Sequence, residues 1–250
     1  MVFLGQITWV LLIIFVVCHI FILIHSFRES KKQGILVLFV PLYVFYYFIK
    51  RWNKLKNLAI IYIISILCII FSQFIWNNYN SFIGLDENIN MTWAQVQNVY
   101  QRRFDLIPNL VETVKGYAKH EQQTFQAVTE ARSKVGGVIQ LKAEDLTPEN
   151  LAKFQRAQAG LSGALQRLMV VVERYPELKA NQNFIRLQYE LAGTENQIAV
   201  ERRRFNEAVQ QYNRTIHSFP QNILAGMFGF EARPYFEADT QAQGAPRFEF

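Results

Sequence analysis

Three apolar runs occupy residues 7–27, 34–49 and 58–76, and they constrain the fold more than any other feature of the sequence. A helix that crosses a bilayer needs about 20 apolar residues, so the first and third runs are long enough to span. The second run is shorter and contains Pro41. It is interpreted as a tilted span, a re-entrant hairpin or an interfacial helix. The first run lacks a basic start and a small-residue cleavage site, so it is not expected to be a cleaved signal peptide.

The runs predict a division of the chain into four parts. Residues 1–57 are expected to form an N-terminal membrane region, with a helix at 7–27, a short apolar helix or hairpin at 34–49 and a basic loop at 50–57. Residues 58–76 are the expected transmembrane anchor. A helical bundle is expected at 77–219, followed by an aromatic, glycine-containing segment at 220–250.

The positive charge of the chain is concentrated beside the apolar runs. Residues 1–57 hold a single acidic residue, Glu29, and seven basic residues: Arg28, Lys31, Lys32, Lys50, Arg51, Lys54 and Lys56. The rest of the chain is balanced, so the pI of 9.3 does not indicate nucleic-acid binding. Basic loops beside apolar runs favour contact with lipid headgroups and the cytoplasmic side.

The side of the membrane follows from these loops. If the middle run spans, the loops at 28–32 and 50–57 lie on opposite sides and differ by one charge. If it does not span, both loops are cytoplasmic. Either alternative predicts that residues 77–250 lie on the non-cytoplasmic side of the bacterial inner membrane.

Few residues of the chain suggest catalysis, a cofactor or a metal. Cys18 and Cys68 both lie in apolar runs, which leaves the soluble part without a disulfide framework or a thiolate zinc site. His19 is expected to be a neutral imidazole bonded to a neighbouring helix, with an intramembrane functional role as the alternative. The soluble histidines, His120 and His217, do not form a metal-ligand cluster in sequence. We therefore expect no enzyme activity.

The soluble part has the apolar spacing of helices. Ile89, Trp93, Val96, Tyr100, Phe104 and Ile107 follow steps of three and four residues. Pro108 predicts a kink or break near Ile107, because proline lacks an N–H and crowds the preceding turn. A second helix is expected to begin at Thr147-Pro148-Glu149 and to stop at Pro176.

A third helix, at about 182–217, has the most regular pattern. Apolar residues recur every seven positions at Phe184, Leu191, Ile198, Phe205, Tyr212 and Phe219. Between them lie Gln188, Glu195, Arg202, Val209 and Ile216. This spacing predicts a coiled-coil-like helix. The fold class is therefore all-α, with transmembrane helices followed by an elongated antiparallel helical bundle.

Charged and amide residues on these helices are expected to pair across the bundle, because buried polar groups need partners. We call this set the polar seam: Arg102, Arg103, Asp105, Glu112, Gln188, Glu195 and Arg202. We favour a structural role for the seam over a role in which its carboxylates act as acid/base catalysts. In the C-terminal segment, Phe228, Phe230, Tyr235 and Phe236, with Phe248 and Phe250, are expected either to dock on the bundle or to bind a neighbour.

Several stretches resemble the LemA family of bacterial membrane proteins. They are RRFDLIPNLVETVKGYAKHE (102–121), AVTEARSKVG (127–136), the long run at 171–213 beginning VVERYPELKANQNF, and FP…FGF…YFE (219–237). The resemblance implies a membrane-anchored helical bundle with one N-terminal membrane helix before a Tyr-Asn pair. The run at 58–76 followed by Tyr79-Asn80 fits that helix, whereas residues 1–57 depart from the family pattern.

The sequence therefore predicts a membrane-anchored scaffold that self-associates into a homo-oligomer at the bacterial envelope. The alternative is a membrane-tethered adaptor or signalling module that binds another envelope protein. Mass in mild detergent separates the two, because an adaptor is expected to stay small until a second protein is added.

Overall fold

The computed structural model describes residues 2–237, with side chains for residue 6 and for residues 8–237. Phe248 and Phe250 lie outside the described residues. The described part is helical and contains no strand, so the all-α prediction is confirmed. The chain forms two compact units, Met1–Asn80 and Ser81–Phe250, and the long helix α4 (Trp52–Lys115) contributes to both.

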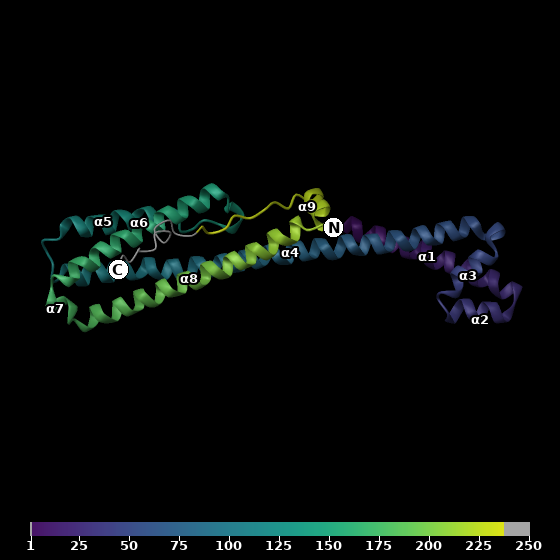
Figure 1. Cartoon of the computed structure of the whole chain (residues 1–250), viewed down its shortest axis with the longest axis horizontal. Coiled ribbons are helices and arrows are strands. Elements are labelled where there is room, and N and C mark those ends of the chain that lie inside the picture. The colour runs from purple at the N-terminus through teal and green to yellow at the C-terminus, as the bar shows by residue number, and fades with distance from the viewer. Residues whose placement is uncertain (1, 238–250) are drawn as a thin grey trace, which may run out of the picture. The chain divides into compact units, whose positions relative to one another are not determined.

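The first unit contains α1 (Val2–Glu29), α2 (Lys31–Phe39), α3 (Tyr43–Lys50) and the start of α4 (Figure 1). Its core takes one or more side chains from each helix, including Ile22, Val37, Phe48 and Ala59. Two helices of the described part are long and apolar enough to cross a membrane: Thr8–Glu29 within α1, and α4.

The middle apolar run forms two short helices rather than one. The chain is extended at Val40, before Pro41, and α3 begins at Tyr43. The expected basic loop at 50–57 is wrong as a loop, because α4 already begins at Trp52. Residues 52–57 contain neither glycine nor proline, so nothing in them opposes the start of a helix.

Of the kink or break predicted near Ile107, the break is not seen, since α4 continues through Pro108 to Lys115; the kink stays a prediction. A proline at this position leaves the carbonyl of Phe104 without the N–H that normally bonds to it. Arg132 of α5 (Gln122–Gly136) donates from Nε to that carbonyl at 3.4 Å. The helix ends instead before Gly116, and the chain reverses into α5.

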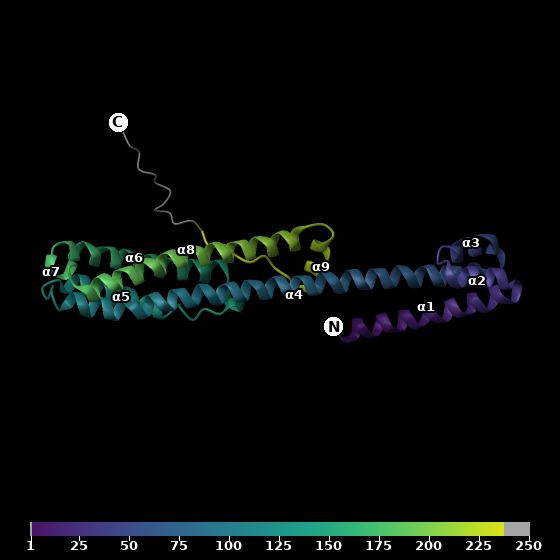
Figure 2. The same cartoon turned by 90° about the horizontal axis from the view of Figure 1, so that it is seen from below.

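The second unit is an antiparallel bundle of α4, α5, α6 (Pro148–Glu173) and α8 (Gln182–His217) (Figures 1 and 2). The short η1 (Ala143–Asp145) and α7 (Pro176–Lys179) lie in the connections, and α9 (Gln221–Phe228) follows α8. Trp93 contacts Phe205 and Arg103 contacts Glu195, so residue numbers rise along α4 as they fall along α8.

Both long connections end in capped helix starts. Thr147 accepts a hydrogen bond from the backbone N–H of Asn150, and Pro148 takes the first position of α6, as predicted. Asn181 caps α8 in the same way through the N–H of Phe184. The bounds of α8 match the expected helix at 182–217.

The seven-residue repeat of α8 marks the face that packs into its own bundle. Phe184, Leu191, Ile198, Phe205 and Tyr212 are buried, as are Val209 and Ile216. Phe219 is different, because it lies beyond the end of α8 and is exposed. The coiled-coil-like packing expected of this helix stays a prediction.

Candidate functional site: a buried arginine and a docked C-terminal segment

Arg103 is the charged residue at the centre of the bundle. It lies on α4, one turn from Tyr100 and Ile107 on the core face, and its side chain is 2% exposed. One guanidinium nitrogen donates to Glu195 Oε1 at 2.8 Å and to Ser162 Oγ at 3.0 Å. The other donates to Gln158 Oε1. The guanidinium therefore joins α4 to α6 and α8.

This arrangement favours a structural role for Arg103. Its charge is balanced by Glu195, and its hydrogen bonds are fixed by side chains of two other helices. Removing Glu195 would leave the buried guanidinium charge uncompensated, which is costly, whereas the Glu195 side chain is 42% exposed and partly solvated. A cavity of about 360 Å³ lies beside the pair, between α6, α8 and Glu237.

The other expected seam residues are not brought together. Arg102, Asp105, Glu112 and Gln188 are exposed, so they lie outside the buried contact. Asp105 accepts from Gln101 at 2.8 Å, and Glu112 accepts from Lys115 at 3.1 Å. Both contacts are made within α4, so only Arg103 and Glu195 pair across the bundle as the seam requires.

Arg202 binds the C-terminal segment instead of another seam residue. Its guanidinium donates to the carbonyl of Glu237 at 2.8 Å and lies over the ring of Phe236. Gln155 of α6 donates to the same carbonyl at 3.2 Å. These contacts hold the end of the described chain against two helices.

Two asparagines on α8 hold the segment by its backbone. Asn213 accepts from the N–H of Arg233 at 2.9 Å and donates to its carbonyl at 2.8 Å. Asn206 makes the same pair of bonds with Phe236, at 2.8 and 3.0 Å. The asparagines are seven residues apart and share one helix face, so they dock an extended chain along α8.

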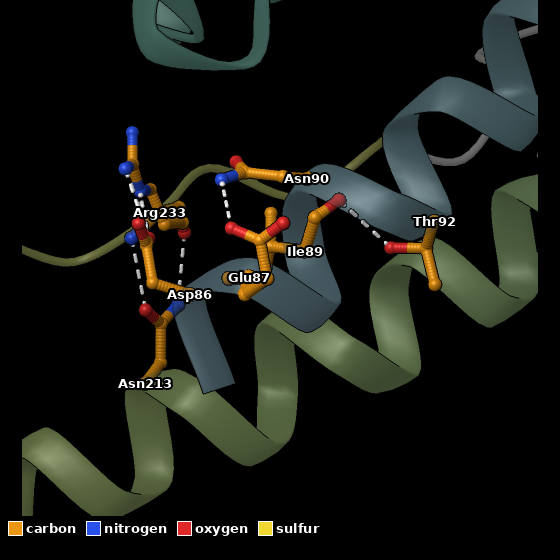
Figure 3. A network of polar contacts seen from close by, with 7 residues as sticks. All are labelled: Asp86, Glu87, Ile89, Asn90, Thr92, Asn213 and Arg233. Atoms are coloured by element: carbon orange, nitrogen blue, oxygen red, sulfur yellow. Dashed lines mark hydrogen bonds and ion pairs between the residues drawn. The ribbon is translucent and has the colours of Figure 1, made fainter. Parts of the chain in front are cut away.

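The Arg233 side chain adds an ion pair to this docking. Two of its nitrogens donate to Asp86 Oδ1, at 3.1 and 2.9 Å. Figure 3 shows Asp86 on α4, Asn213 on α8 and Arg233 on the segment pointing toward one another. Tyr212 is buried near this pair, and its pKa is raised by burial and, to a smaller degree, by the Asp86 carboxylate.

Phe236 completes the aromatic core of the bundle. It is buried, and its ring lies 5.3 Å from that of Phe205 and 6.0 Å from that of Trp93. Trp93 also contacts Phe154 and donates from Nε1 to the carbonyl of Leu141 at 2.8 Å. Of the two alternatives for the C-terminal aromatics, docking on the bundle is the one seen for Phe236.

The remaining aromatics of the segment differ in burial. The ring of Phe230 lies 5.2 Å from that of Phe82, which ties the end of α9 to α4. Phe228 is half-buried, and Tyr235 is exposed. Tyr235 is therefore the member of the expected set that is most open to another molecule.

A second surface lies on the outer side of α8. An open hollow of about 560 Å³ is lined by residues of α8 and by Arg102 of α4. Tyr189 stands beside it and is 75% exposed, and Gly193 lies one turn further along α8. A Cβ on Gly193 would meet no atom within 4 Å, so the bundle itself does not require glycine there. We call Ile185, Tyr189, Gly193 and Gln197 the outer α8 face.

Polar groups in the first unit form a connected series. His25 Nδ1 lies 2.7 Å from the Tyr47 hydroxyl, which donates to Glu29 at 3.1 Å. Glu29 pairs with Arg51 at 2.6 Å. His19 contacts the Tyr62 hydroxyl of α4 at 3.3 Å, the neighbouring-helix partner expected for it.

The basic residues of this unit are mostly open to their surroundings. Apart from the half-buried Arg51, they are exposed: Arg28, Lys31, Lys32, Lys50, Lys54 and Lys56. Six cations are thus available to anionic groups outside the chain.

Sequence reasoning missed several residues of the site. Trp93 was recognised only as an apolar position, and Gln158, Asn206, Asn213 and the Asp86–Arg233 pair were not singled out. The seven-residue spacing of Asn206 and Asn213 is a signal that could have found the docking face, since it matches the repeat of α8.

Comparison with known proteins finds one family model and several bacterial relatives. The model of the LemA family matches residues 92–250. The magnetosome protein MamQ 2 of Paramagnetospirillum magneticum is 29% identical over 192 residues, which cover 70% of this chain and 71% of that protein. MamQ of Magnetospirillum gryphiswaldense is 28% identical over 190 residues, covering 69% and 70%. The protein LemA of Metamycoplasma hominis is 24% identical over 141 residues, covering 56% and 60%. The family match includes the buried arginine and the docked segment.

Proposed function

The chain belongs to the LemA family, and from this premise we propose that it is a membrane-anchored helical scaffold that self-associates at the bacterial envelope. The proposed role involves no catalysis, cofactor or nucleic acid. Its partners are further copies of the same chain and the lipids around it.

The outer α8 face is the observation that carries self-association. Tyr189 projects from this face, and the hollow beside Gly193 has room for a side chain. A two-fold axis brings the same patch of two copies together, so a projection and a hollow on one patch can fit each other. Glycine inside a helix costs about 1 kcal/mol relative to alanine. Close approach of a second chain would explain why position 193 is glycine, which packing within the bundle does not explain.

Membrane anchoring is supported by α1 and α4, which are long and apolar enough to span. The nine residues of α2 and the eight of α3 reach about 14 and 12 Å at the usual helical rise, against about 30 Å of hydrocarbon. Their length supports the re-entrant hairpin alternative, in which the seven basic residues share one side.

With both basic segments on one side, the positive-inside rule favours the cytoplasm for them and the opposite side for the bundle. The proposed location is the cytoplasmic membrane of a bacterium, with more than one span. Exposed cations at Arg28, Lys31, Lys32, Lys50, Lys54 and Lys56 suit anionic headgroups. A reporter enzyme that works only outside the cytoplasm, fused after residue 250, tests this orientation.

Particle mass in mild detergent tests self-association. We expect the full-length chain to form a particle of several copies, and we expect the version lacking residues 1–57 to form a smaller one. Tyr189→Ala and Gly193→Leu are expected to lower the mass while helix content is kept. Val170→Ala, which changes an exposed apolar side chain of α6, is the matched control. A monomer in every form that enlarges only with a second protein would instead favour the adaptor.

A further inference from the structure

We propose that α9 lies on the bilayer surface, with Phe219, Ile223 and Met227 in the interface between headgroups and acyl chains. The inference rests on the proposed membrane anchoring and adds a second, peripheral contact between the bundle and the lipid. It follows from the exposed side of α9, its lack of charge and the contact of Phe230 with Phe82, a residue close to the predicted span along the chain.

The exposed side of α9 carries large apolar side chains beside the polar Asn222. Phe219 is 81% exposed, Ile223 55% and Met227 71%. Their spacing of four residues places Ile223 and Met227 on one helix face, and Phe219 lies in the turn that precedes α9. Leu224 and Ala225, on the other side, are buried against the bundle. The side of the helix that its own bundle leaves uncovered is thus mainly apolar, with Asn222 as its polar member.

The residues of α9 itself are uncharged. The eight residues of α9, QNILAGMF, contain no Lys, Arg, Asp or Glu. A large uncharged apolar face is unfavourable in water, because the free-energy cost of hydrating it rises with its exposed apolar area. The same face enters a membrane interface without desolvating an ion.

The position of α9 in the bundle supports lipid over other occupants. Since α8 is antiparallel to the part of α4 in the second unit, its C-terminal end returns to the beginning of that part. Figures 1 and 2 show α9 at this end of the bundle. The ring contact between Phe230 and Phe82 fixes it there.

Phe82 is close to the predicted span along the chain. It follows Trp76, the last residue of that span, by six residues of α4, or about 9 Å at the helical rise. The headgroup layer adds about 5–8 Å on each side of the hydrocarbon. Side chains directed outward from a helix tied to Phe82 are therefore within reach of the interface.

Nitroxide accessibility in lipid nanodiscs tests the proposal on the full-length chain. Cys18 and Cys68 are the two cysteines, so a Cys18→Ala, Cys68→Ala background allows single labels. Labels are placed by Ile223→Cys and Met227→Cys, with Gln211→Cys on exposed α8 as the water control. Leu67→Cys, exposed inside the predicted span, is the lipid control. Each label is measured for collisions with oxygen, which concentrates in lipid, and with a nickel chelate, which stays in water.

The expected result is that oxygen collisions exceed nickel collisions at 223 and 227, as at 67, with the reverse at 211. Nickel access at 227 equal to that at 211 would overturn the proposal, because α9 would then face water. Protection from both reagents would also overturn it, since protein and not lipid would cover the face. Nickel access at 67 would contradict the membrane anchoring itself, which separates failure of the premise from failure of this inference.

Discussion

Arg132 replaces the backbone donor that Pro108 removes: its Nε bonds to the carbonyl of Phe104 at 3.4 Å, while its guanidinium lies 3.8 Å from the centre of the Phe104 ring. A side chain from α5 thus repairs the hydrogen-bond ladder of α4. The contact joins the two helices at the point where a kink or break was expected.

Replacement of Arg132 by methionine is expected to destabilise the bundle by about 1–2 kcal/mol, the sum of a hydrogen bond and a cation–π contact. Pro108→Ala restores the N–H, so Arg132→Met should cost less in that background. Thermal unfolding followed by circular dichroism measures this cycle. Arg186→Met, on the exposed side of α8, is the control. Equal costs with and without Pro108 would show that the two positions are not coupled.

Arg103→Met is expected to cost about 1–3 kcal/mol, because the buried side chain of Gln158 loses its donor, while Glu195, which is 42% exposed, stays partly solvated. The double variant Arg103→Met, Glu195→Gln should recover little of that loss. Denaturant unfolding of the full-length chain in detergent gives both values. The neighbouring Arg102→Met changes an exposed arginine and should fall within about 0.5 kcal/mol of the parent. Similar costs at 102 and 103 would argue against the central role of Arg103.

Asn206→Ala and Asn213→Ala are each expected to release the C-terminal segment locally. Each removes two hydrogen bonds to one residue of the segment, at roughly 1 kcal/mol per bond. Hydrogen–deuterium exchange should accelerate in a peptide covering residues 230–237. Asn222→Ala, on the exposed side of α9, should leave that peptide unchanged. Slow exchange in both asparagine variants would mean that the Phe236 ring and the contacts of Arg233 and Glu237 hold the segment without the asparagines.

Phe236→Ala is expected to destabilise the bundle by about 3 kcal/mol or more, since it opens a cavity among buried aromatic rings. The adjacent Tyr235→Ala removes an exposed ring and should change stability by about 0.5 kcal/mol or less. Trp93, 6.0 Å from Phe236, offers a fluorescence signal for the first variant. A stability loss at 235 that matches the loss at 236 would contradict the observed docking.

Alkaline pH is expected to weaken the bundle through Tyr212. Its folded pKa is raised above the unfolded value of 10.0, first by burial and then by Asp86. A raised folded pKa contributes stability that is fully present below pH 10 and is lost as pH rises through the folded value. Unfolding free energies between pH 9 and pH 11, about one unit either side of an ordinary tyrosine pKa, should fall less steeply in Tyr212→Phe. Parallel slopes would contradict this assignment.

Helix patterns predicted most of the fold because burial on one side of a helix leaves a periodic trace. The start of α6 and the bounds of α8 followed from such local signals. The continuation of α4 through Pro108 could not be predicted in this way. The missing backbone hydrogen bond is replaced by one from Arg132, which lies on another helix. Local rules describe what a proline removes and not what a distant side chain supplies.

The site was less predictable for a similar reason. Steps of three and four residues from Tyr100 fit both Arg103 and Phe104 on the core side of α4, and the sequence favoured Phe104. Arg103 is buried because it has three polar partners on α6 and α8. These partners are far apart in the sequence, so the spacing along α4 does not reveal them. The docked segment is extended and short, so it has no periodicity of its own.

The aromatic core imposes an order on biosynthesis. Trp93, Phe154 and Phe205 are translated well before Phe236, which packs between them. A nascent bundle that has already formed α8 still lacks the ring that fills its centre. The core can therefore pack completely only after Phe236 has been translated. A product truncated before that residue would leave apolar side chains exposed, and proteases and chaperones recognise such surface.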